Sequence, residues 1–313
     1  MAKWSTLYTE IPSARATGNL DLRAQCTALR IEHDARGRVS GVLYSDAEGR
    51  QQMQRAALVA VAANAIETPR LLLNSESSRF RQGLANGNGH VGRFYTRNLN
   101  ASAWGLFDKP VHMNRGTTMN GTIYDEARHD PTRGFAGGYL MQGVGVGIPF
   151  LAAVFKPQGW GRDFTRFIDN YSHLSGVWLN GEDLPCAENR ISLHATEKDQ
   201  HGLPIPNVHV DEHENEAAMR KHFDLQAENI LRAAGATDVM HGVPLPASHN
   251  MGTCRMTSSP DTGVTDRWGC SHEIPNLFIS DGSLFPTSTA ENPTLTIVAL
   301  ALRQAQRILS KSA

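Results

Sequence analysis

The sequence predicts a mixed α/β fold, and three stretches carry this prediction. The continuous apolar run Ala57–Ala63 has the composition of a strand that is buried on both faces. Residues Asn215–Ala234 repeat apolar side chains at helical spacing, and Gly235 is suited to end that helix. Near the C-terminus, Leu277–Ser280 predicts a strand that a loop joins to a long apolar helix. The 313 residues are enough for one large domain or two closely packed ones.

Composition and charge restrict the class of function. The formal net charge of −1 creates no long-range field that would favour nucleic acid or an anionic membrane surface. The four cysteines are widely separated and form no C-x-x-C pair, which argues against a zinc ribbon or a disulfide framework. The opening residues, MAKWSTLYTEIPSARATG, contain no apolar core of signal-peptide length. The uncharged stretch Gly134–Phe155 is glycine-rich, so a buried strand and loop is expected there and a membrane span is the weaker alternative.

The first hundred residues predict three strands and a short helix. Leu20–Ile31 alternates apolar and polar side chains, and Val39–Tyr44 follows the turn ARGR. The apolar run Ala57–Ala63 is the third strand. The segment ETPRLLLNS then predicts a short helix with Pro69 in its first turn. Residues from about 100 to 214 are rich in Gly, Trp and Tyr and predict irregular strands.

Two helix starts are predicted in the last hundred residues. Asn215 can cap the first of these helices, whose apolar face is formed by Met219, Phe223, Gln226, Ile230 and Ala233. Asn292 stands where the cap of the last helix belongs, with Pro293 at its first helical position. A helix start presents unpaired N–H groups and a partial positive charge, which can stabilise an anion.

The stretch SHNMGTCRM places His249 three residues before a Gly-Thr pair. Its residues alone leave three interpretations open: a packed core histidine, a metal ligand or a catalytic base. Two other stretches resemble functional motifs without their context. GNGHVG, Gly87–Gly92, spells G-x-G-x-x-G, but no predicted strand precedes it, so a loop is expected. HVDEH, His209–His213, is not H-E-x-x-H and lies between a strand and a helix, so no metal site is predicted.

Three segments together resemble the glucose-methanol-choline (GMC) oxidoreductases. They are VAVAANAIETPRLLLNS, HNMGTCRM and LFISDGSLFPTSTAENPTLTIVALALR. The resemblance is closest to the flavoprotein subunits of bacterial membrane-bound gluconate and sugar-alcohol dehydrogenases. It covers nearly the whole chain, but only the later part of the family's sequence. It implies an FAD-binding α/β domain formed by residues 1–100 and 215–313, with a substrate domain, residues 101–214, inserted into it.

The resemblance assigns roles position by position. His249 matches the family's catalytic histidine, and Asn292 matches its partner, which is His in some members and Asn in others. Five positions match contacts to FAD. Ala28 matches a strand residue beside the adenine, and Asp281 and Gly282 match the turn at the ribityl-phosphate region. Pro293 and Thr294 match the helix start beneath the pyrimidine ring. Two positions depart from the family's pattern, since Asn64 replaces a usual Gly and Asn98 stands where many members have His.

The implied activity is FAD-dependent oxidation of a CH–OH group in a sugar, sugar acid or polyol. A histidine with a pKa near 6.5 suits removal of the hydroxyl proton, and an amide can hold the oxygen. The family's Gly-rich turn for the FAD pyrophosphate and the Cys-rich run of its gluconate-dehydrogenase-like members are not matched, so the implied FAD site is incomplete. The alternative is a catalytically silent remnant, or a half-enzyme that binds a ligand or a partner chain. A metal hydrolase built on His209 and His213 is a weaker third interpretation.

The family also implies partners and a location. Its membrane-bound dehydrogenases pass electrons to a cytochrome c subunit, some with an additional small subunit, in the periplasm at the membrane. The sequence itself carries no compartment signal.

Overall fold

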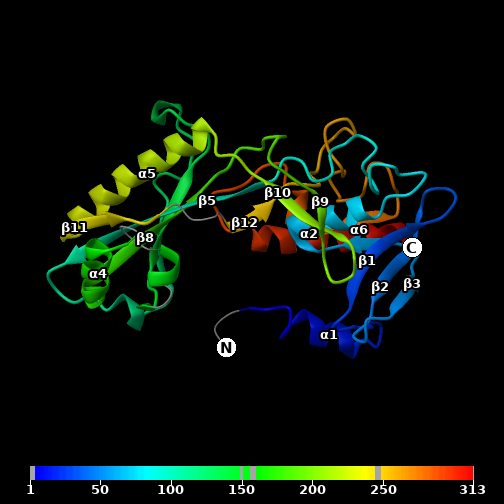
Figure 1. Ribbon diagram of the computed structural model, residues 1–313, viewed down its shortest axis with the longest axis horizontal. Helices are drawn as coiled ribbons and strands as arrows, with labels where there is room; N and C mark the ends of the chain where they lie inside the picture. Colours follow the sequence, from blue (N-terminus) through cyan, green and yellow to red (C-terminus); the bar gives the residue numbers. More distant parts are fainter. Residues whose placement is uncertain (1–3, 149–150, 156–159, 244–247, 313) are drawn as a thin grey trace.

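The protein was analysed as a computed structural model that describes residues 4–148, 151–155, 160–243 and 248–312. Two lobes lie at the two ends of the long strand β5 (Figure 1). The helices and longer strands are α1 (Glu10–Ala16), β1 (Thr27–His33), β2 (Val39–Ser45), β3 (Gln51–Arg55), β4 (Val59–Val61), α2 (Asn64–Asn74), β5 (Thr96–Phe107), β6 (Met119–Ile123), β7 (Tyr139–Val144), α4 (Arg162–Asp169), β8 (Leu174–Gly181), β9 (Arg190–Lys198), β10 (Pro204–His209), α5 (Glu214–Ala233), β11 (Ala236–His241), β12 (Ser248–Met251), β13 (Leu277–Ile279) and α6 (Thr294–Ser312).

The lobe that contains both chain ends holds two small sheets. β1, β2 and β3 form an antiparallel sheet in that order, and β4 pairs in parallel with β13. The strand predicted at Leu20–Ile31 was too long, because β1 begins only at Thr27 and both Leu20 and Leu22 are exposed. Strand β3 was not predicted, because all of its residues are exposed and show no alternation of burial.

The third predicted strand, Ala57–Ala63, is shorter than expected. Only Val59–Val61 of this stretch forms a strand, β4. Ala60 at the centre of β4 is exposed, so the prediction of burial on both faces was wrong. The predicted strand at Leu277–Ser280 is confirmed as β13, which pairs Leu277 with Val59. Apolar side chains from these strands and from α2 form the core of this lobe.

Helix α2 begins earlier than predicted, at Asn64. Asn64 has φ +74°, in the left-handed region that Gly and Asn adopt most easily, and its Oδ1 accepts hydrogen bonds from the N–H groups of Ile66 and Glu67. Asn64 therefore adopts a conformation that a Gly would also allow, and its side chain bonds the first turn of the helix. Pro69 lies inside the helix, not in its first turn. Its missing N–H would have bonded the carbonyl of Ala65, which instead accepts the Thr253 hydroxyl at 2.9 Å.

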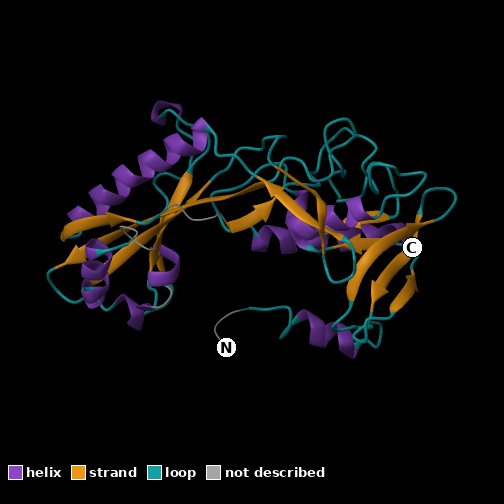
Figure 2. Cartoon of the chain, in the orientation of Figure 1, coloured by secondary structure: helices purple, strands orange, loops and turns teal. Residues whose placement is uncertain are grey.

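The other lobe is built on an antiparallel sheet, and the predicted strands of this region are present. Register shifts interrupt the pairs β11–β5, β12–β5 and β6–β7. Its strand order is β11-β5-β8-β7-β6, and β12 also pairs with β5. Odd-numbered residues of β5, such as Leu99 and Ala101, pack with Met219 and Phe223 of α5, which covers that face (Figure 2). The opposite face carries a second apolar cluster around Trp104.

The predicted amphipathic helix is confirmed as α5, with differences in its cap and its buried face. His213 precedes the first turn, and its N–H donates to Glu216, whereas Asn215 bonds the backbone of Ala136. Ala227 and Leu231 are buried in place of the predicted Gln226 and Ile230, and Gly235 follows the helix in a left-handed conformation. Helix α5 packs on the sheet of β5 and β8, and β11 pairs with β5 at its edge, although both elements follow residue 214. The division of the chain at 100 and 214 remains a prediction.

Three further sequence expectations can be located. Gly87–Gly92 lies in a loop, as predicted, and a Cβ on Gly92 would come within 2.1 Å of the Ile191 carbonyl oxygen. The stretch 134–155 contains β7, although residues 149–150 are outside the described ranges. In the described part of the chain, no helix has the length and apolar character needed to cross a bilayer.

Candidate active site

His249 lies on β12, which pairs with the first residues of β5. Ser248 is opposite Asn98, and Met251 is opposite Thr96. His249 has φ +59°, a left-handed conformation that is uncommon for a residue with a side chain and occurs most often at turns and functional sites. The imidazole is half-buried, and this burial lowers its pKa below the usual value. Its Nδ1 is 2.6 Å from the Ser248 hydroxyl oxygen.

The Gly-Thr pair after His249 holds this conformation. Gly252 has φ +81°, and a Cβ there would come within 2.0 Å of the Phe94 carbonyl oxygen, so only glycine fits. Thr253 is also left-handed, with φ +66°. Its N–H bonds the Arg93 carbonyl, and its hydroxyl bonds the Ala65 carbonyl of α2. The backbone around His249 is thus fixed between β5 and α2.

The turn Asp281–Gly282, which follows β13, lies against the segment that carries His249. The buried carboxylate of Asp281 accepts four hydrogen bonds, from the Asn64 N–H, the Thr68 hydroxyl, and the N–H and hydroxyl of Ser283. Both carboxylate oxygens are engaged within the chain, so Asp281 ties the end of β13 to the start of α2. A Cβ on Gly282 would lie 2.9 Å from the carbonyl oxygen of Asn250, the residue after His249. The structure therefore brings the predicted turn and the predicted histidine together.

The last helix begins one residue later than predicted. The first helical hydrogen bond runs from the Ile297 N–H to the Pro293 carbonyl, which places Pro293 at the cap and Thr294 at the first helical position. Asn292 precedes the cap and is exposed. Within the described ranges, no hydrogen bond of its side chain is present, so the prediction that Asn292 caps α6 was wrong.

Asn98 connects the histidine segment with the loop that leads to α6. Its backbone pairs with Ser248, and its side-chain amide donates to the Thr289 carbonyl at 2.6 Å. The sequence identified Asn98 only as a departure from the family's His. Its side chain is fully buried, yet Oδ1 has no partner in the described part of the chain, and neither has the hydroxyl of Thr96 on the same face of β5. A buried acceptor without a donor costs about 1–3 kcal/mol, so this position suits a ligand that donates a hydrogen bond.

Ala28 lies on the other side of α2. It is exposed on β1 and lines a hollow of about 260 Å³ together with Ala63, Glu67 and Arg70. Ala63 directly precedes the residue whose N–H binds Asp281. Ala28 and the Asp281 turn therefore lie near the same end of α2. The first turn of α6 approaches Gly282 through Ile297, whose Cδ1 would lie 3.5 Å from a Cβ on that glycine.

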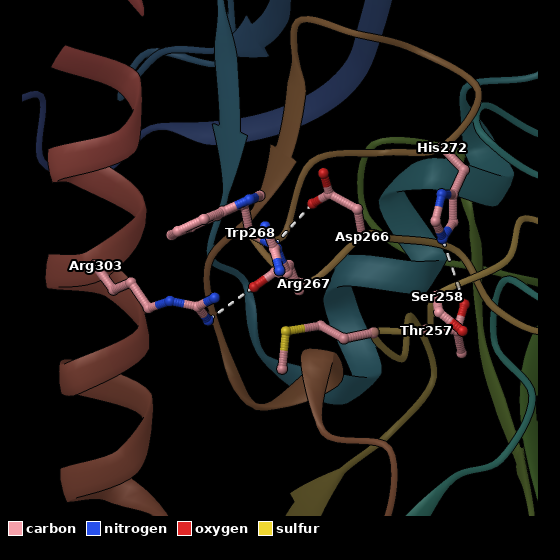
Figure 3. Close-up of a pocket in the computed structure, with 8 residues that line it drawn as sticks. Thr257, Ser258, Asp266, Arg267, Trp268, His272 and Arg303 are labelled. Atoms are coloured by element: carbon pink, nitrogen blue, oxygen red, sulfur yellow. Dashed lines mark hydrogen bonds between the residues drawn. The ribbon is translucent and has the colours of Figure 1, made fainter. Parts of the chain in front are cut away.

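A larger hollow, of about 490 Å³, lies beside α6 (Figure 3). Figure 3 shows Arg303 pointing from the helix towards the loop that carries Trp268. The guanidinium carbons of Arg303, Arg267 and Arg307 lie 4.1, 5.2 and 5.5 Å from the centre of a Trp268 ring. None of the predicted site residues lines this hollow, although Met256, the last residue of SHNMGTCRM, does.

The two histidines of HVDEH do not form a cluster. His209 lies 3.2 Å from Asp211, and His213 precedes α5. Among the described residues, no group of three or more His, Cys, Asp or Glu side chains is arranged to hold a metal ion.

Comparison with known proteins gives the family. Two family models, both described as GMC oxidoreductase, match residues 1–93 and 185–301. The 2-methyl-1,2-propanediol dehydrogenase of Mycolicibacterium austroafricanum is 36% identical over 95% of this chain and 55% of that protein. The fructose dehydrogenase large subunit of Gluconobacter japonicus is 27% identical over 99% of this chain and 57% of that protein.

The fold agrees with this assignment. A crystal structure of formate oxidase superposes with a TM-score of 0.68, at 16% identity, over 91% of this chain and 60% of that one. The chain spans slightly more than half the length of the relatives that it matches. The mixed α/β class and the family resemblance are both confirmed. The chain belongs to the GMC oxidoreductases, a family of FAD-binding flavoproteins that act on alcohol or sugar groups.

Proposed function

We propose that this chain carries the catalytic histidine of an FAD-dependent oxidoreductase for CH–OH groups of a sugar, sugar acid or polyol. In this proposal the sheet β11-β5-β8-β7-β6, here named the substrate sheet, belongs to the substrate-binding part of that enzyme. One observation supports this proposal most strongly. His249 is held in a left-handed conformation where β12, β5 and the Asp281–Gly282 turn meet, with Nδ1 engaged by a neighbour. A structural histidine needs no such backbone, whereas a general base must be aimed at one proton.

In this proposal His249 Nε2 takes the hydroxyl proton of the substrate. Asn292, which lies free at the approach to α6, offers an amide to the same oxygen. FAD, when bound, supplies the hydride acceptor. Five residues would hold it: Ala28, Asp281, Gly282, Pro293 and Thr294. The orphaned acceptor on Asn98, between the histidine segment and the loop before α6, fits the polar edge of a ring or a substrate hydroxyl.

The pH dependence of kcat/KM tests the role of His249. The imidazole must be neutral to accept a proton, so kcat/KM is expected to fall as the pH drops through its pKa. Burial lowers that pKa, so the fall should begin below pH 6.5 and the enzyme should stay active at slightly acidic pH. The measurement is a pH–rate profile of the FAD-containing enzyme. An acidic limb that persists unchanged in His249→Gln would assign the titration to another group.

Asn292→Ala separates a role in chemistry from a role in stability. Because Asn292 is exposed and precedes the cap, its loss should change the free energy of unfolding by less than about 0.5 kcal/mol. The rate of flavin reduction by a saturating substrate is expected to fall at the same time, because the substrate oxygen loses an amide donor. Stopped-flow reduction and thermal unfolding are measured on the same preparations. A variant reduced as fast as the wild type would exclude Asn292 from the site.

A second candidate function, a half-enzyme that binds a partner segment, is favoured by the surface of α6. Leu295, Leu302 and Leu309 recur every seven residues and are 81%, 62% and 70% exposed. A row of exposed leucines on one helix face marks a surface that another element covers. Arg303 and Arg307 lie to one side of this row, over Trp268, and in the described part of the chain neither forms an ion pair. The proposed occupant is an amphipathic helix with an acidic edge from the FAD-binding segment that the relatives carry outside the matched region.

The edge of strand β4 also favours binding of the FAD-binding segment, here through a strand of that segment. It pairs with β13 on one side, and in the described part of the chain no strand pairs with its other edge. Ala60 and Ala62 are exposed there. A strand of the FAD-binding segment would satisfy this edge. The further partners that the resemblance implies are a small subunit and a cytochrome c subunit, with the complete enzyme in the periplasm at the membrane.

A further inference from the structure

A chain of hydrogen bonds runs from the substrate sheet to His249. The Trp178 indole N–H on β8 donates to Asn100 Oδ1 on β5 at 3.1 Å. Asn100 Nδ2 in turn is 3.3 Å from Ser248 Oγ, which is 2.6 Å from His249 Nδ1. Asn100 is almost completely buried, and Trp178 packs edge-on against Phe155, so the sheet end of the chain is fixed.

The direction of the first two bonds follows from the groups themselves. An indole N–H can only donate, so the atom of Asn100 that faces Trp178 must be its oxygen. The amide NH₂ of Asn100 therefore faces Ser248, and Ser248 Oγ accepts from it. A serine hydroxyl has two lone pairs and one O–H, so Ser248 can either accept the Nδ1–H of His249 through its second lone pair or donate its own O–H to Nδ1. Since Nδ1 is engaged by Ser248, Nε2 is the nitrogen left to meet a substrate.

We propose that Ser248, oriented by Asn100 and Trp178, is a positioning residue that accepts the Nδ1–H of His249 and so leaves Nε2 unprotonated for the substrate hydroxyl. This inference rests on the proposed function of His249 as the base. When Nε2 takes the hydroxyl proton, the imidazole becomes an imidazolium with one proton on each nitrogen. Ser248 keeps the same hydrogen bond in both states, and that bond becomes charge-assisted when the ring is protonated.

The ring tautomer can be measured without turnover. Long-range ¹H–¹⁵N correlation spectra of ¹⁵N-histidine-labelled protein distinguish an Nδ1–H ring from an Nε2–H ring, and a His249→Gln spectrum identifies the signals of His249. The wild type is expected to show the Nδ1–H tautomer at a pH where the ring is neutral. Ser248→Ala should give a mixture of tautomers, and Ser248→Thr should restore the single form.

A matched control is Ser102→Ala. Ser102 is a buried serine on the same face of β5 as Asn100. It accepts an indole N–H from Trp104, but it has no hydrogen bond with His249 in the described part of the chain. This variant should leave the His249 tautomer unchanged. In the FAD-containing enzyme, Ser248→Ala is expected to lower kcat about five- to tenfold, with KM within about twofold of the wild type and recovery in Ser248→Thr.

The outcomes separate this inference from the function on which it rests. Identical His249 spectra in the wild type and in Ser248→Ala would overturn the positioning role and leave the base role of His249 untouched. A single Nε2–H tautomer in the wild type would overturn the inference and also count against His249 as the base, because Ser248 would then donate to Nδ1. Loss of kcat in Ser248→Ala that Ser248→Thr does not restore would indicate a packing effect and also overturn it.

Discussion

Replacing His249 by alanine in the FAD-containing enzyme is expected to lower kcat by about 10²–10⁴-fold, the usual range for the loss of a general base. The flavin content should remain near that of the wild type, because the FAD contacts proposed here come from Ala28, the Asp281–Gly282 turn and the start of α6. Steady-state kinetics and the ratio of flavin to protein absorbance measure the two quantities. An unchanged kcat would remove His249 from the chemistry.

His209→Ala is the matched control for this variant. His209 is half-exposed and pairs with Asp211 at the end of β10. Its loss is expected to leave kcat within about twofold of the wild type, since a surface ion pair contributes little to stability. A large effect of His209→Ala would instead favour the interpretation of HVDEH as a functional site.

The chain of 313 residues alone is expected either to be poorly soluble or to bind FAD weakly, and in both cases to show no alcohol dehydrogenase activity. The pyrophosphate of FAD is held in this family by a Gly-rich turn at a helix start, which this sequence does not match. The exposed leucines of α6 favour association through apolar surface, and so does the edge of β4 that no described strand pairs with. Adding the FAD-binding segment of a relative, in the same polypeptide or as a separate chain, should give a yellow protein.

The visible flavin spectrum after gel filtration measures this outcome. Leu302→Glu should reduce the flavin recovered with the added segment by at least tenfold, because a carboxylate would be buried against the proposed helix. Leu225→Glu is the control, since Leu225 is similarly exposed but lies on α5 in the other lobe. A stable monomer of the chain alone, with one flavin and dye-reducing activity, would contradict the prediction.

Local sequence patterns were sufficient for the elements whose contacts are nearby in the chain. Helix α5 has a strong apolar repeat and a glycine at its end, and β13 is a short apolar run before a turn, so both were predicted. The family resemblance was likewise readable from the segments around His249 and Asn292. The catalytic roles of these two residues remain predictions.

The misplaced elements depend on distant partners. Pro69 can lie inside α2 because the hydroxyl of Thr253 satisfies the carbonyl that proline leaves free. The start of α2 is set by Asn64, whose left-handed backbone is bound by Asp281. Asn98 and Ser248 meet only when β12 pairs with β5. No pattern of spacing within one segment reveals such contacts, because each joins residues far apart in sequence.

The continuity of β5 has a mechanical consequence for the enzyme cycle. One end of this strand supports the segment of His249 through β12, and the rest pairs with β11 and β8 in the sheet of the other lobe (Figure 1). A rotation of one lobe against the other would have to bend an unbroken hydrogen-bonded strand. We therefore expect the lobes to resist rotation against each other, so that a displacement of the sheet would be carried along β5 to the backbone beneath His249.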